Sequence, residues 1–151
     1  MSSRVLCLAP AHVAAIVAAA RSRFPAECCG LLEGASTGRG WVVRAIHETG
    51  NLADHPERRF LIDPQFQIGL LRALRGTGRG VIGCFHSHPG GRAEPSPADL
   101  AGATERDFLW LIVAVEPDRI VLSAYLFTGD GFETVELQQS LDDCRPLGRT
   151  L

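Results

Sequence analysis

The sequence has no surplus of charge of either sign. Seventeen acidic residues stand against 15 basic ones, so the net charge is −2 at pH 7 and the isoelectric point is about 6.2. Nucleic acids and anionic membranes are usually bound through strongly basic surfaces, because their phosphates carry negative charge. We therefore expect no nucleic acid and no membrane among the partners, which leaves small molecules and proteins.

Long apolar runs are also absent. The longest, VAAIVAAA and FLWLIVAV, are far shorter than the roughly 20 residues that a membrane-spanning helix needs. The N-terminal stretch MSSRVLCLAPAH lacks the uninterrupted apolar region of a secretion signal. We expect a cytoplasmic protein without a membrane anchor.

Paired cysteines at metal-binding spacing are missing as well. The cysteines are five in number, and none forms a C-x-x-C motif. An odd count without this motif argues against a disulfide scaffold and against a zinc site built from thiolates. We expect reduced cysteines, with those in apolar runs acting as small buried hydrophobic residues.

The chain does contain enough apolar residues, 46% of 151, for the core of one domain spanning residues 1–151. Helical and alternating apolar patterns, ended by glycine, proline and aspartate, indicate three helices and six strands. Their order predicts an α/β domain in which a mixed β-sheet is flanked by helices. The expected helices cover 10–23, 63–76 and 96–103, and the expected strands cover 27–34, 40–48, 80–88, 107–115, 119–127 and 132–138.

Two of the five histidines, His86 and His88, lie at the end of the expected strand 80–88. Alternate residues of a strand face the same side with their Cα atoms about 6.5 Å apart, so both imidazoles can bind one metal ion. The turn at 89–91 would allow Asp99 to return a carboxylate to the same point. Two imidazoles and one carboxylate leave one tetrahedral position of zinc open for water, whose pKa falls to about 7 in such catalytic sites.

The segment around Asp99 has a second interpretation. Ser96 as N-cap, Pro97 at the first helical position and Asp99 facing back to the backbone form a capping box at the start of a helix. The two interpretations are partly compatible, because a helix start fixed in this way would also hold Asp99 rigidly for metal binding.

Amide hydrolysis also needs a group that takes a proton from water and delivers it to the leaving amine. Glu27 is the first candidate, because it directly precedes the apolar run CCGLL, where a carboxylate is unexpected unless something polar lies nearby. The alternative is that Glu27 is a charged residue at the mouth of a strand and faces water. Glu33 is the second candidate, because it lies an even number of positions after Glu27 and both side chains would face the same side of the expected strand.

Glu27 in FPAECCGLLEG, followed by HSHPGGRAEPSPAD, resembles the signature of the JAMM (MPN-plus) metalloproteases, a glutamate upstream of H-x-H-P-x6-S-x2-D. The resemblance extends to RFLIDP, WLIVAV and AYLFTGDGFETVEL. It implies zinc ligands at His86, His88 and Asp99, a general acid/base at Glu27 and an oxyanion-stabilising hydroxyl at Ser96. It also implies a fold like that of cytidine deaminases, although the P-C-x-x-C motif that deaminase chemistry needs is absent.

The resemblance to stand-alone bacterial JAMM proteins implies a zinc-dependent metallopeptidase or isopeptidase. The implied partner is a ubiquitin-like protein, most specifically a sulfur carrier that ends in Gly-Gly. Two other functions stay open, namely a non-catalytic MPN scaffold and a zinc hydrolase of small acyl-amino acids. The sequence indicates no oligomeric state.

Other potential metal ligands are assigned no role. Cys84 shares its strand parity with His86 and His88 and could approach the metal, but a buried packing role is favoured. His12, His47 and His55 are expected at or near the surface.

Overall fold

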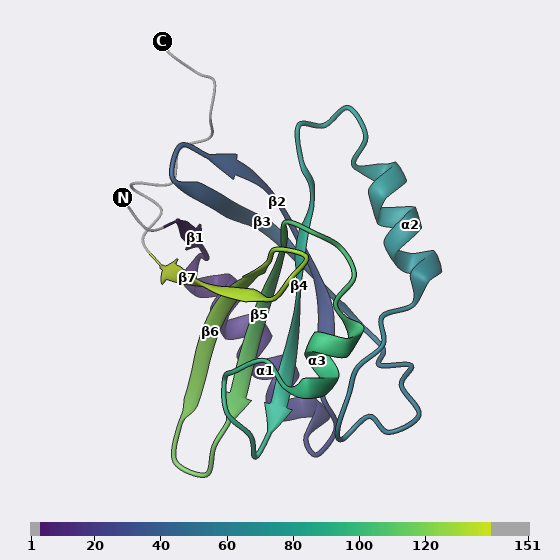
Figure 1. Ribbon diagram of the computed structural model, residues 1–151, viewed down its shortest axis with the longest axis vertical. Helices are drawn as coiled ribbons and strands as arrows, with labels where there is room; N and C mark the ends of the chain where they lie inside the picture. The colour runs from purple at the N-terminus through teal and green to yellow at the C-terminus, as the bar shows by residue number, and fades with distance from the viewer. Residues whose placement is uncertain (1–3, 140–151) are drawn as a thin grey trace.

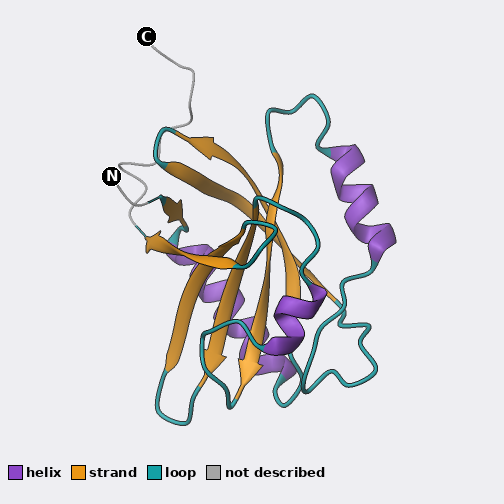
Figure 2. Cartoon of the chain, in the orientation of Figure 1, coloured by secondary structure: helices purple, strands orange, loops and turns teal. Residues whose placement is uncertain are grey.

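The computed structural model describes residues 4–139 of the chain. Within them, seven strands and three helices follow one another, and the strands form one closed sheet (Figures 1 and 2). In chain order the elements are β1 (Val5–Cys7), α1 (Pro10–Arg23), β2 (Cys29–Thr37), β3 (Gly40–Thr49), α2 (Pro64–Ala73), β4 (Gly80–Pro89), α3 (Pro97–Gly102), β5 (Phe108–Val115), β6 (Ile120–Phe127) and β7 (Phe132–Gln138).

The sheet is mixed, as the sequence predicts. Its spatial order is β1-β3-β2-β4-β5-β6-β7, and β1 pairs in parallel with both β3 and β7, which closes the ring. The pair β4 and β5 is also parallel, whereas the hairpin β2–β3, the pair β2–β4 and the meander β5–β6–β7 are antiparallel. β1 was not among the expected strands, because three residues are too few to show a periodic pattern.

Helix α1 packs on the sheet at the bounds that the sequence predicts. Pro10 occupies its first turn, where a missing N–H costs nothing. Its buried residues Ile16, Ala19 and Ala20 join a core cluster with Leu32, Phe85, Leu111 and others from the sheet. Figure 1 shows α1 behind the central strands and α3 in front of β4, so the two helices lie on opposite sides of the strand that carries both histidines.

Helix α2 stands further from the sheet. The Asp63 carboxylate caps it by accepting a hydrogen bond of 2.9 Å from the Gln65 N–H, and the helix ends at Ala73, three residues before the predicted end. None of its residues is buried, and Phe66, Ile68 and Leu71 are exposed. No helix among residues 4–139 is long and apolar enough to span a membrane.

The cysteines differ from one another in state. Cys28, Cys29 and Cys84 are buried free thiols, as expected. Cys7 takes part in a disulfide, so the prediction of reduced cysteines is wrong for this residue. Cys144 lies outside the described residues.

Candidate active site

Strand β4 brings the two predicted histidines to one point. It is paired on both edges, with β2 and with β5, so its side chains have fixed positions. His86 is fully buried and His88 is nearly so, and their Nε2 atoms lie 3.0 Å apart. The strand ends in a turn at Gly90, whose φ of 68° is one that glycine adopts without strain.

Asp99 reaches the same point from the start of α3. Its Oδ2 lies 3.1 Å from His86 Nε2 and 3.0 Å from His88 Nε2. The capping box is also present, because Ser96 Oγ accepts a hydrogen bond from the Asp99 N–H and Asp99 Oδ2 accepts one from the Ser96 N–H. The capping-box interpretation is confirmed, and metal binding by Asp99 stays a prediction that is compatible with it, since the cap fixes the carboxylate that faces the histidines.

The hydrogen bond on the outer ring nitrogen of His88 fits a cation between the two rings, whereas His86 Nδ1 is buried without a hydrogen-bond partner. His88 Nδ1 lies 2.6 Å from the Arg92 carbonyl, to which it must donate its N–H, so the Nε2 lone pair of the neutral ring faces inward. Without a cation, His88 would need an extra proton to face Asp99. Burial by itself lowers the pKa of His88, but Asp99 and the Arg92 carbonyl raise it above its ordinary value. A divalent metal ion between His88 and Asp99 would replace that proton, and its positive charge would balance the negative charge of the Asp99 carboxylate.

The pKa shifts of His86 and Asp99 also favour metal binding. Burial lowers the pKa of His86, which keeps the ring neutral. Burial alone would raise the pKa of Asp99, but His86 and His88 hold it well below its usual range, so the group is a carboxylate. Neutral imidazole nitrogens and a carboxylate oxygen are ligands that zinc prefers.

Glu27 lies beside His86 and His88, just before β2 begins at Cys29. Its side chain is 4% exposed, and a carboxylate oxygen, His86 and His88 present ligand atoms within 4.8 Å of one another. Its Oε1 is buried without a hydrogen-bond partner. Burial raises the pKa of Glu27 to about 7, with His88 lowering it and Asp99 raising it. The alternative of a charged residue that faces water is wrong for Glu27.

Two neighbours of the site were not singled out from the sequence. Ser87 points away from the histidines by strand alternation, and its Oγ accepts a hydrogen bond of 2.8 Å from the Cys28 N–H, next to Glu27. Phe60 stacks on the His86 ring with centroids 4.3 Å apart. Each of the two residues makes a contact that only the fold creates.

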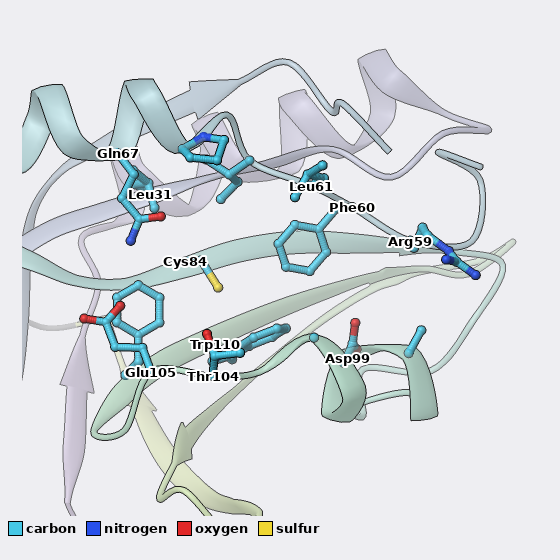
Figure 3. A pocket seen from close by; sticks show the side chains of 15 residues that line it. Leu31, Arg59, Phe60, Leu61, Gln67, Cys84, Asp99, Thr104, Glu105 and Trp110 are labelled. Carbon is cyan, nitrogen blue, oxygen red and sulfur yellow. The ribbon is translucent and has the colours of Figure 1, made fainter. Parts of the chain in front are cut away.

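Two cavities border the site. The first, which we name the channel, has a volume of about 290 Å³ and runs from Asp99 past Phe60 and Trp110 toward Glu105. Figure 3 shows Phe60 and Leu61 on one side of it, Trp110, Thr104 and Asp99 on the other, and the Cys84 sulfur between them. Cys84 is thus part of an apolar wall, and burial raises its pKa well above that of a free thiol.

The second cavity, which we name the charged cavity, has a volume of about 440 Å³. Glu27, His88 and Ser96 form part of its lining, so it opens onto the proposed base and the predicted oxyanion donor. The rest of the lining is mostly charged or turn-forming and comprises Glu57, Arg58, Pro89, Gly91, Arg92, Glu94 and Pro95.

Glu33, the second candidate for the base, lines neither cavity. It pairs with Val81 of β4, five residues before His86, which corresponds to roughly 16 Å along the strand. Its carboxylate is bound by His47 Nε2 at 2.9 Å and by Arg79 at 3.1 Å. Register shifts on both sides of Glu33 interrupt the alternation on which its candidacy depended.

Comparison with known proteins identifies the family of this chain. A family model described as prokaryotic homologs of the JAB domain matches residues 9–125. The chain belongs to this family. Membership confirms the resemblance to JAMM (MPN-plus) proteins and the expected fold of the JAB domain.

Individual relatives and a solved structure extend the match over most of the chain. A desampylase of Haloferax volcanii is 34% identical over 113 residues, which are 75% of this chain and 78% of that protein. The CysO-cysteine peptidase of Mycobacterium tuberculosis is 32% identical over 133 residues, or 87% and 88% of the two chains. The solution structure of a Desulfitobacterium hafniense protein superposes with a TM-score of 0.77 at 31% identity and covers 91% of this chain and 94% of its own.

Proposed function

We propose that this JAB-domain protein is a zinc-dependent peptidase or isopeptidase that hydrolyses the amide bond after the C-terminal Gly-Gly of a ubiquitin-like sulfur-carrier protein. One observation carries the proposal. His86, His88 and Asp99 direct three ligand atoms to one point, beside the buried and unpartnered carboxylate of Glu27. Relatives named desampylase and CysO-cysteine peptidase support a hydrolase. Its cytoplasmic location stays a prediction.

The proposed metal site consists of His86, His88 and Asp99. Zinc held there would polarise the scissile carbonyl and make hydroxide available near neutral pH. The chain's own contribution is to fix the three ligands: β4 fixes the imidazoles, the Arg92 carbonyl orients His88, and the capping box orients Asp99.

Glu27 is the proposed proton carrier. It would take a proton from the attacking water and give it to the leaving amine. Without a cation, burial raises its pKa to about 7, and a group that titrates near neutral pH accepts and releases protons readily. Its carboxylate has no competing partner on Oε1, so nothing must be broken before it acts.

Ser96 is the proposed oxyanion donor. Its Oγ accepts a hydrogen bond of 3.0 Å from the Asp99 N–H, which leaves the hydroxyl hydrogen free to point into the charged cavity. A fixed donor of this kind stabilises the negative charge that develops on the carbonyl oxygen, and its loss typically costs a factor of about 10² to 10³ in rate.

The channel is the proposed binding place of the Gly-Gly tail. The Phe60–Ile62 segment forms one wall, and within residues 4–139 the N–H groups of Phe60 and Ile62 have no hydrogen-bond partner. An extended tail could pair with this wall as an added strand. Glycine would pass along the contacting rings of Phe60 and Trp110, whose centroids lie 5.5 Å apart, because it has no side chain to clash with them. The charged cavity would then receive the leaving group.

The test uses carrier proteins extended past Gly-Gly by one or more residues, alongside the same carriers with the second glycine changed to valine. We expect cleavage of the first set and little of the second, by protein that contains about one zinc per chain. Equal cleavage of both sets would contradict the glycine channel. Hydrolysis of short acyl-amino acids alone would indicate the small-molecule hydrolase, and protein without zinc or activity would indicate the scaffold.

A further inference from the structure

The segment between β3 and α2 borders the whole candidate site. Residues 50–63 form neither helix nor strand, yet Glu57 and Arg58 line the charged cavity and residues 59–62 line the channel. A segment of this length without regular hydrogen bonding needs another source of order if it is to present fixed walls to a substrate.

One side chain supplies much of that order. The Asn51 Nδ2 group donates to the Glu27 carbonyl at 3.1 Å and to the Arg59 carbonyl at 3.0 Å. Its Oδ1 accepts hydrogen bonds of 3.0 Å from the N–H groups of Ala53 and Leu61. Both N–H donors and both acceptor positions of the carboxamide are therefore used.

These bonds join two parts of the site that are far apart in sequence. One bond holds the main chain of Glu27, the proposed base, whose N–H also donates to the Pro56 carbonyl at 2.7 Å. Two others hold the residues on both sides of Phe60, whose ring stacks on His86 at 4.3 Å with an interplanar angle of 22°. The Asn51 carboxamide thus connects the base to the aromatic wall that packs on a proposed ligand.

We propose that Asn51 is a positioning residue for the reaction: its carboxamide sets Glu27 and Phe60 relative to His86. The proposal rests on the function proposed above. Asn51 touches neither ligand atoms nor the cavities, so it acts only through the residues that it holds. A displacement of about 1 Å in a catalytic group can cost a factor of about 10² in rate, so this kind of support has a measurable effect.

Asparagine is required at this position because the four bonds need a donor and an acceptor on one short, planar group. Aspartate has the same shape but only accepts, so Asn51→Asp would keep the bonds from Ala53 and Leu61. It would lose those to Glu27 and Arg59 and would set a negative charge against their carbonyl oxygens. Asn51→Asp therefore keeps a polar side chain of the same shape and removes the bonds that position Glu27 and Arg59.

The first test compares Asn51→Asp with Thr77→Ala, measuring kcat, KM and zinc content at a temperature where both variants are folded. Thr77 is a matched control, because its hydroxyl also bonds a turn, near the end of α2 and outside both cavities. We expect Asn51→Asp to keep its zinc and to lose about 10- to 100-fold in kcat. Thr77→Ala should keep the wild-type kcat. Wild-type kcat in Asn51→Asp would overturn the proposal.

The second test combines Asn51→Asp with Glu27→Gln. If Asn51 acts through Glu27, most of its effect on kcat should vanish when the base is already gone, because coupled residues are not additive. A purely structural role would give the same fold-loss in both backgrounds, which would contradict the positioning role.

A third measurement is independent of activity and of the metal. In the metal-free protein, the Phe60 ring should shift the NMR resonances of the His86 ring protons that it covers. This shift should decrease in Asn51→Asp and persist in Thr77→Ala. Unchanged His86 resonances in Asn51→Asp would overturn the proposal, whereas failure of the wild type to cleave any carrier would overturn only the proposed function.

Discussion

Two buried glutamates, Glu27 just before β2 and Glu33 within it, have opposite electrostatic states. Glu33 is bound on one oxygen by His47 and on the other by Arg79, and these hydrogen bonds lower its pKa. Glu27 has no partner on Oε1, and burial raises its pKa to about 7. Both side chains are less than 10% exposed, so burial does not separate them.

The difference lies in how each residue is held. Glu33 is fixed through its carboxylate, which is therefore occupied. Glu27 is fixed through its main chain, by the Pro56 carbonyl, the Asn51 side chain and the Ser87 hydroxyl at the next residue. A catalytic carboxylate needs a fixed position and a free functional group, and main-chain support provides both.

The largest effect is expected at the proposed metal ligands. Asp99→Ala should lose most of the bound zinc and all measurable activity, because two neutral imidazoles alone form an incomplete site. Metal analysis of the purified protein measures this. Ser96→Ala is the matched control: it also disrupts the capping box but keeps the Asp99 carboxylate, so zinc should remain while activity falls. Full zinc occupancy in Asp99→Ala would remove Asp99 from the site.

Glu27→Gln should reduce kcat/KM by about 10² to 10⁴ with zinc content unchanged, because the role proposed for Glu27 is proton transfer. Glu33→Gln should leave kcat/KM close to the wild-type value. The pair is compared on the same extended carrier. Loss of zinc in Glu27→Gln would make Glu27 a ligand, and full activity would assign the base to another group.

The sequence predicts which residues come together as candidate metal ligands better than it predicts the residues that hold them in place. Strand alternation places His86 and His88 on one face, and cap chemistry places Asp99, because both rules act over a few residues. Alternation fails for Glu33, where register shifts interrupt the strand. The role of Asn51 has no local signal at all, since its partners lie up to 24 residues away and are main-chain groups of any residue type. The sequence does not predict the short strand β1 for a related reason, because β1 is held by pairing with two strands that are distant in sequence.

Glu33 should affect stability and not catalysis. Its pKa is lower in the folded protein than in the unfolded chain, so its contribution is present above the unfolded pKa of about 4.3 and is lost as pH falls through the folded pKa. We expect Glu33→Gln to cost about 1 kcal/mol near neutral pH, a small value because the side chains of Arg79 and His47 are partly exposed. The difference in free energy of unfolding between wild type and variant should shrink in acid. Urea titrations at pH 7 and pH 3.5 measure it, and a difference that grows in acid would contradict the assignment.

The smallest effect is expected from thiol alkylation. The burial that raises the pKa of Glu27 to a useful value of about 7 also raises the pKa of its neighbour Cys28 to about 11. The same buried environment therefore allows the Glu27 carboxylate to exchange protons near neutral pH and keeps the Cys28 thiol protonated. Because only a thiolate reacts readily with iodoacetamide, Cys28 should not be alkylated. Treatment of the native protein should leave activity unchanged, whereas a zinc chelator should abolish it. Mass spectrometry would verify that Cys28, Cys29 and Cys84 stay unmodified. Inactivation by iodoacetamide with zinc still bound would show that a thiol takes part in the reaction. Proton transfer would then be assigned to a cysteine and not to Glu27, which contradicts the contrast between Glu27 and Glu33.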